Sequence, residues 1–108
     1  MTDRWRWHGV NAVADCPPEG EPVPYLRALA VRLRAGGWRE ELVLPAGSRP
    51  YVRVINPVLV VLNDEITAAP TAPGLWWFWW SWGDRIACAD NVDLTVARIS
   101  VVLGGNGD

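Results

Sequence analysis

Lysine is absent from this chain of 108 residues, and histidine, methionine and phenylalanine each occur only once. The ten basic residues are therefore all arginines, and with twelve acidic residues they leave a net charge of −2. A nucleic-acid-binding protein needs a clustered basic face that neutralises phosphates. Here the arginines are dispersed among the acidic residues, so we expect no nucleic-acid partner.

Long apolar runs are also lacking, although 50% of the residues are hydrophobic. No stretch approaches the roughly 20 apolar residues that a membrane-spanning helix needs, and residues 1–8 lack the apolar core of a secretory signal. We therefore expect a cytoplasmic chain with no membrane partner. The length suits one domain, which we place at residues 23–108, after an irregular N-terminal arm at residues 1–22.

Cysteine is scarce, with only Cys16 and Cys88 present. They lie far apart in the sequence, lack the paired spacing of a zinc site, and are accompanied by a single histidine. We expect no metal and no cofactor. Two reduced thiols are the favoured interpretation in a reducing compartment, and a disulfide that fixes the arm to the domain is the alternative.

Two segments have the periodicity of amphipathic helices. Residues 24–35 place four apolar side chains at intervals of three and four and are followed by two glycines, which are typical of a helix end. Residues 90–103 repeat this pattern near the end of the chain, with Asp90 as the expected N-cap. The sequence thus predicts a helix on either side of its central part.

The central part reads as strands joined by short turns. Residues 38–44 and 51–55 alternate with a period of two and predict a hairpin. Residues 65–69 and 75–82 predict further strands. Residues 58–62 are continuously apolar and are compatible with either a buried strand or an apolar loop.

This order predicts an α+β fold of two layers. Sequential strands joined by short turns favour an antiparallel meander, here of three to four strands, and an N-terminal and a C-terminal helix would pack on one of its faces. The opposite face of the sheet is then open to solvent or to a partner.

The most unusual feature is an aromatic strand at residues 75–83, which holds five of the eight tryptophans. Side chains of a strand alternate between its faces. One face would carry Trp76, Phe78, Trp80 and Trp82, and the other Trp77, Trp79 and Ser81. Burial of the four large rings would contribute roughly 15 to 25 kcal/mol of gross hydrophobic free energy, so we assign the first face to the core.

Trp77 and Trp79 would then lie on the open face, where a two-layer domain has nothing to cover them. Three arrangements are open: the arm covers them with Trp5 and Trp7, a second copy of the chain covers them, or they form a binding surface. All four tryptophans are therefore candidate binding residues.

The functional prediction is a small non-catalytic interaction or regulatory module that binds a protein partner, or itself, through the tryptophan-rich face. Arg53 and Asp84 are candidate polar contacts at that surface. The alternative is a module that binds a small apolar molecule, or a cofactor-free enzyme for a hydrophobic substrate. In the enzyme, Asp84, Arg53 or Glu65 would supply the polar group.

Three sequence features carry a resemblance to a known group: the helix at residues 26–38, the segment Val52-Arg53-Val54-Ile55-Asn56-Pro57, and above all Trp80-Ser81-Trp82-Gly83-Asp84-Arg85-Ile86. From residue 26 to 103 the chain resembles small actinobacterial α+β proteins with a Trp-Ser-Trp-Gly-Asp/Glu-x-Ile strand, a group without an assigned activity. Such proteins are often encoded beside helix-turn-helix regulators, which implies a regulatory accessory role. The resemblance implies no catalytic residues.

Overall fold

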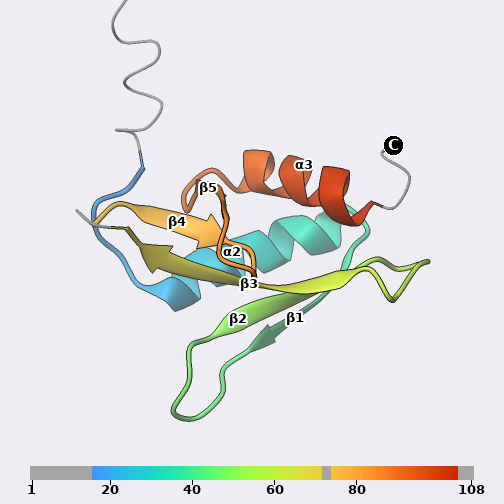
Figure 1. Ribbon diagram of the computed structural model, residues 1–108, viewed down its shortest axis with the longest axis horizontal. Helices are drawn as coiled ribbons and strands as arrows, with labels where there is room; N and C mark the ends of the chain where they lie inside the picture. Colours follow the sequence, from blue (N-terminus) through green and yellow to red (C-terminus); the bar gives the residue numbers. More distant parts are fainter. Residues whose placement is uncertain (1–15, 72–73, 105–108) are drawn as a thin grey trace, which may run out of the picture.

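The computed structural model describes residues 16–71 and 74–104 of the chain. They form an antiparallel sheet of five strands with a helix before it and a helix after it (Figure 1). In chain order the elements are α2 (Pro22–Ala35), β1 (Arg39–Val43), β2 (Tyr51–Ile55), β3 (Asn63–Pro70), β4 (Trp76–Trp79), β5 (Arg85–Cys88) and α3 (Val92–Leu103). The predicted α+β class is confirmed, with five strands instead of three to four.

The strands follow one another in the sheet as they do in the chain, β1-β2-β3-β4-β5, and every neighbouring pair is antiparallel. This is the expected meander. The extra strand is β5, which the sequence pattern hides because it is only four residues long and follows a turn directly after the aromatic strand. Within the described residues, no helix is long and apolar enough to cross a bilayer.

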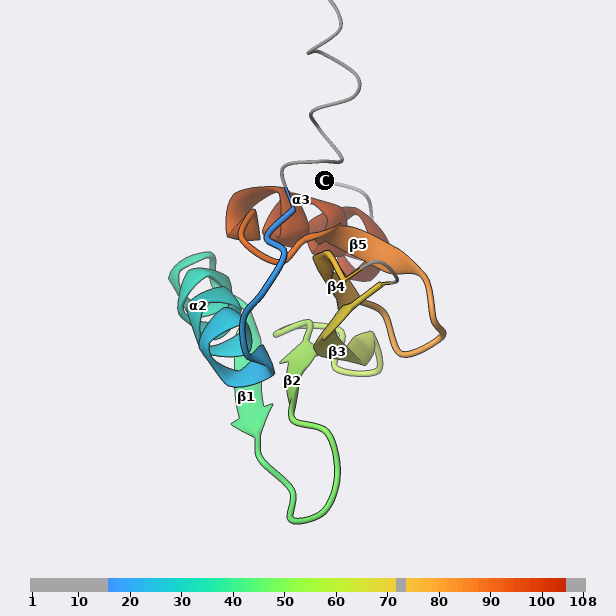
Figure 2. The same ribbon diagram turned by 90° about the vertical axis from the view of Figure 1, so that its left-hand side faces the viewer.

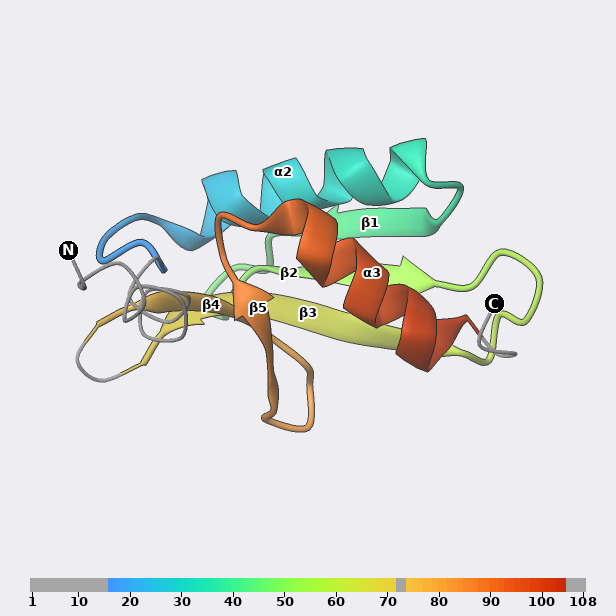
Figure 3. The same ribbon diagram turned by 90° about the horizontal axis from the view of Figure 1, so that it is seen from above.

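The two helices lie on the same side of the sheet, as Figure 2 shows from one end and Figure 3 from above. Helix α2 contacts β1, β2 and β3, whereas α3 contacts β5 and α2. The helices are also linked by an ion pair, since Arg32 lies 2.8 Å from Asp93 in the first turn of α3. The N-cap of α3 is Asn91, not the expected Asp90: its side chain accepts the backbone N–H of Leu94.

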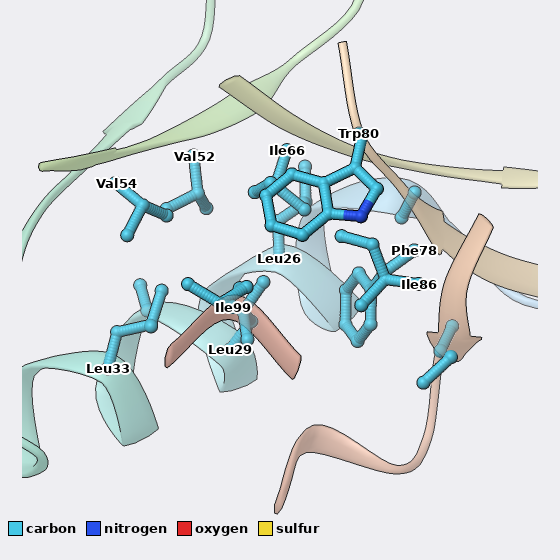
Figure 4. Packing of buried hydrophobic residues seen from close by; sticks show 14 of the residues in the cluster. Leu26, Leu29, Leu33, Val52, Val54, Ile66, Phe78, Trp80, Ile86 and Ile99 are labelled. Atoms are coloured by element: carbon cyan, nitrogen blue, oxygen red, sulfur yellow. The ribbon is translucent and has the colours of Figure 1, made fainter. Parts of the chain in front are cut away.

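The core lies between the helices and the sheet (Figure 4). It confirms two of the tryptophan-strand assignments, because Phe78 and Trp80 are both buried there. Trp76 is half-buried at the border of this core, with its ring centroid 5.6 Å from that of Tyr25 on α2. The largest fully buried apolar side chains of the helices and strands are Leu26, Leu29, Leu33, Val52, Val54, Ile66, Phe78, Ile86 and Ile99.

The core assignment of Trp82 is wrong, because its side chain is 55% exposed. Strand β4 ends at Trp79, so the alternation between faces does not continue to residue 82. A tight turn follows, in which the Gly83 N–H donates to the Trp80 carbonyl and the Trp80 N–H donates to the Asp84 carbonyl, at 3.1 and 2.9 Å. Gly83 has φ of 99°, a conformation that glycine adopts at little cost.

The expectation of two separate thiols is also wrong: Cys16 and Cys88 form a disulfide, with their Cα atoms 5.0 Å apart. Cys16 is only 1% exposed. The next residue continues this contact, because the Pro17 carbonyl accepts the backbone N–H of Trp76 at 2.8 Å. The described end of the N-terminal arm is thus bound to β4 and β5 before α2 begins.

The apolar run at residues 58–62 forms a loop between β2 and β3, not a strand. Asn56 organises this loop, because its side-chain oxygen accepts the backbone N–H groups of Val58 and Leu59 at 2.9 and 2.8 Å. Its amide nitrogen donates to the Leu103 carbonyl at the end of α3, at 2.8 Å. A buried side chain with three such partners explains how a short apolar loop keeps a defined shape.

Candidate binding site on the open sheet face

The face of the sheet that points away from the helices carries a row of side chains across all five strands. Val43 lies opposite Tyr51, and Trp79 lies opposite both Thr67 and Arg85. Tyr51 and Thr67 are neighbours because the next residues along, Val52 and Ile66, are paired. The row therefore places one aromatic side chain on β2 and one on β4, with a small threonine between them on β3.

A hollow of 610 Å³ lies over the middle of this face. It is bounded by the loop between β1 and β2 and by the turn between β4 and β5, both of which extend away from the helices in Figure 2. The side chains that line the hollow include Arg49, Tyr51, Glu65, Thr67, Ala69 and Trp79. A volume of this size lies within the range of small-ligand sites.

Trp79 is held in a fixed orientation at the wall of the hollow. Its indole Nε1 donates to the Ala69 carbonyl on β3 at 3.0 Å. The only hydrogen-bond donor of the side chain is thereby used, so what Trp79 offers to a ligand is its aromatic surface. Its half-buried state leaves part of that surface accessible.

An ion pair borders the hollow on the side of β2. Arg53 donates from Nη2 to Glu65 Oε2 at 2.7 Å, across the β2–β3 pairing. The hydrogen bond to Glu65 is the main cause that raises the pKa of Arg53, with the nearby Glu41 adding to it. The Arg53 guanidinium also lies 5.9 Å from the centre of the Tyr51 ring. Glu65 is therefore the acidic member of the lining, and its charge is balanced.

Trp77 lies on the same face but is not part of the hollow. The guanidinium of Arg85 lies over its ring, 4.5 Å from the ring centre, which is within the range of a cation–π interaction. Its Nε1 is buried and has no hydrogen-bond partner among the described residues. The predicted pair is thus divided, with Trp79 in the hollow and Trp77 under Arg85.

The other predicted binding residues do not lie together in the hollow. Arg53 contacts the hollow through its partner Glu65. Asp84 is not in the lining; it accepts the indole N–H of Trp82 at 3.0 Å within the β4–β5 turn. Trp5 and Trp7 lie outside the described residues, so the proposed cover by the arm stays a prediction.

Sequence reasoning missed Tyr51, Thr67 and Arg49 as lining residues. A signal for Tyr51 was present, since it shares a strand face with Arg53 by the period of two. Thr67 carries no such signal, because its importance comes from being small between two aromatic neighbours. Arg49 belongs to a loop whose position no periodicity predicts.

The Trp-Ser-Trp-Gly-Asp signature forms the β4–β5 turn at one rim of the hollow. Asp64 of β3 holds this turn, because its carboxylate accepts the backbone N–H of Ser81 at 3.0 Å and also the Ser81 hydroxyl. Trp82 stacks on the buried Trp80, with ring centroids 4.7 Å apart. Each conspicuous residue of the signature therefore has a structural task in the turn.

No match was found when the chain was compared with protein-family models, with curated proteins and with solved structures. The geometry of the site must therefore carry the functional argument. Within residues 16–71 and 74–104, no group of three or more histidine, cysteine or acidic side chains is placed to hold a metal ion. The open face provides a hollow lined by the aromatic side chains of Tyr51 and Trp79, with polar groups around them.

Proposed function

We propose that this chain is a small non-catalytic interaction module that binds a protein partner through the open face of its sheet. The observation that carries the proposal is the hollow lined by the side chains of Tyr51 and Trp79, which lie on either side of Thr67 in the sheet. Tyrosine and tryptophan are enriched among the residues that dominate the binding energy of protein interfaces.

The rigidity of the site supports the same conclusion. Trp79 is tied to Ala69, the Arg53–Glu65 pair lies beside Tyr51, and both rings stand on strands of one sheet. A surface whose side chains are already ordered loses little conformational entropy when a partner binds. This favours a recognition surface over side chains that are exposed by chance.

A small-molecule binder, or a cofactor-free enzyme that uses the same surface, is the second candidate. The observation in its favour is the volume of the hollow, 610 Å³, which lies within the range of small-ligand sites. Of the polar groups considered for such chemistry, Glu65 lies in the lining, ion-paired with Arg53. A small molecule retained by the protein in native mass spectrometry would favour this candidate.

Two further aspects are proposals that rest on the sequence. The resemblance to actinobacterial proteins implies a regulatory accessory role. A cytoplasmic location is the expectation from the sequence, and the Cys16–Cys88 disulfide stands against it because such bonds are rare in that compartment. Alkylation of the thiols in acid-quenched cells tests the location of the protein. Two alkylated cysteines support the cytoplasm, whereas a bonded pair indicates an oxidising environment.

Site-specific photo-crosslinking in the producing cells tests the interaction. Benzoylphenylalanine is placed at Ser48, which is exposed at the rim of the hollow, and as a control at Ala97, which is exposed on α3 on the helix side of the sheet. We expect a discrete protein adduct from position 48 that position 97 does not yield. The mass of the adduct shows whether the partner is a second copy of the chain.

Equal crosslinking from both positions, or none from position 48, would contradict the proposal. The second comparison uses Trp79→Ala and Val101→Ala in the background that carries the probe at Ser48. Val101 is exposed on α3, on the helix side of the sheet, so only the substitution at Trp79 should remove the adduct.

A further inference from the structure

We propose that the hollow binds a proline-rich peptide segment in the polyproline II conformation. This inference rests on the proposed function, because it names the chemical class of the partner for the same site. Three features of the lining carry it: the spacing of the two aromatic side chains, the small residues between them, and the kind of hydrogen-bonding groups that remain free.

The spacing creates a slot with an apolar wall on either side. Tyr51 and Trp79 belong to β2 and β4, which are separated by β3. Adjacent strands lie about 4.8 Å apart, so the backbones that carry the two rings are roughly 10 Å apart. Thr67 and Ala69 of β3 form the floor between them. Such small residues leave room for a slender chain to lie between the rings.

The length of the slot suits several prolines. The lining includes β3 residues from Glu65 to Pro70, which correspond to about 17 Å of strand at about 3.4 Å per residue. A polyproline II helix rises about 3.1 Å per residue and has three residues per turn. The floor therefore accommodates about five residues of ligand, or nearly two turns.

The free polar groups of the lining can all donate a hydrogen bond, and the two hydroxyls among them can also accept one. The hydroxyl groups of Tyr51 and Thr67 and the guanidinium of Arg49 form no hydrogen bond to another described residue. One carboxylate oxygen of Glu65, Oε2, is engaged by Arg53. A proline-rich segment has carbonyl acceptors but few N–H donors, so its chemistry complements this lining.

A carbohydrate is the obvious competitor for an aromatic wall, but it fits less well. Each sugar hydroxyl both donates and accepts hydrogen bonds, so a sugar site needs free acceptors as well as free donors beside the aromatic ring. Here one oxygen of the lining carboxylate is ion-paired with Arg53, and the indole N–H of Trp79, a possible donor, is already bound to Ala69. Proline-rich segments also lose little entropy on binding, because they are extended before they bind.

The chain's own proline-rich segment at residues 17–22 does not fill this site within one molecule. The Pro17 carbonyl is bound to the backbone of Trp76, and the following Glu19 carbonyl accepts the Tyr25 hydroxyl at 2.8 Å. This segment is thus held at the start of β4 and at α2. The proposed ligand is a segment of another protein.

The test measures binding of a fluorescein-labelled oligoproline peptide of about ten residues to the full chain by fluorescence anisotropy. A glycine–serine peptide of equal length and a linear glucose oligosaccharide are compared as competitors. We expect saturable binding of oligoproline that unlabelled oligoproline displaces and that neither the glycine–serine peptide nor the oligosaccharide displaces. Competition by the oligosaccharide, or no saturable binding of oligoproline, would overturn the inference.

Three variants locate the binding. Tyr51→Ala removes one wall, and Thr67→Phe fills the slot while it keeps both walls and a residue type that strands favour. Each should weaken binding at least about tenfold, as expected for loss of an aromatic anchor or of its space. Val101→Ala removes an exposed apolar side chain on α3, on the helix side of the sheet, and should leave the affinity within about twofold. Near-ultraviolet circular dichroism checks that each variant is folded.

The outcomes separate this inference from the proposed function. A specific adduct from position 48 together with no oligoproline binding means that the face binds a partner of another chemistry. Oligoproline binding that Thr67→Phe leaves unchanged would show that the peptide does not occupy the slot, and the inference would be wrong.

Discussion

Removal of the Cys16–Cys88 disulfide should lower the stability of the domain by a large and calculable amount. The bonded cysteines are 72 positions apart, so the bond closes most of the domain into one loop. In the chain-entropy model, a loop of that length restricts the unfolded state enough to contribute about 4 kcal/mol at 25 °C. Domains of this size typically have only about 5 to 15 kcal/mol of unfolding free energy in total.

The assay is urea unfolding of the oxidised protein, followed by tryptophan fluorescence with and without a phosphine reductant. We expect the unfolding free energy to fall by about 4 kcal/mol on reduction. For a domain near 100 residues this corresponds to a decrease of roughly 15 to 30 °C in Tm. The double variant Cys16→Ala/Cys88→Ala should match the reduced protein and should not respond to the reductant.

Two results would refute this reasoning. One is rapid alkylation of both cysteines in the native, non-reduced protein, which would show that the bond is absent. The other is a bond that forms but whose reduction changes the unfolding free energy by less than about 1 kcal/mol. In that case the reduced unfolded chain would retain residual structure that already restricts it.

The remaining predictions concern single side chains. Phe78→Ala should lower the unfolding free energy by about 3 to 5 kcal/mol in urea titrations, because it leaves a cavity at a fully buried position; a loss below about 1 kcal/mol would contradict its place in the core. Asn56→Ala should cost about 1 to 3 kcal/mol, because it frees the buried carbonyl at the end of α3, whereas the exposed Asn63→Ala should cost less than about 0.5 kcal/mol. Burial, with Asp90 and Glu19 nearby, raises the pKa of Tyr25. The contribution of Tyr25 to stability is therefore present below the unfolded pKa of about 10 and is lost as the pH rises through the folded pKa. Tyr25→Phe should flatten this part of the alkaline stability profile, and an unchanged slope would contradict the assignment.

The sequence by itself determined the elements whose signal is local. Helices α2 and α3 follow from apolar side chains at intervals of three and four, and the hairpin of β1 and β2 follows from alternation around a turn. Phe78 and Trp80 could be assigned to the core because the period of two relates neighbouring residues of one strand. The sequence also predicted an open sheet face, because two helices packed on one face leave the opposite face uncovered.

Where a strand ends was not determined in this way. The period of two predicts Trp82 on the core face, but β4 ends at Trp79, and the turn held by Asp64 brings Trp82 to the surface. The residue that holds this turn, Asp64, lies on another strand, β3. No pattern within residues 75–83 contains this information.

The candidate site depended most on tertiary structure. Trp79 was identified from its strand, but its counterpart Tyr51 and the floor residue Thr67 come from β2 and β3. The sheet register decides which side chains of three strands become neighbours, and the register depends on turn geometry and on the packing of the opposite face. For the same reason the disulfide was left open by the sequence: its two cysteines meet only because the segment before α2 lies against β4 and β5, and that proximity is a property of the fold.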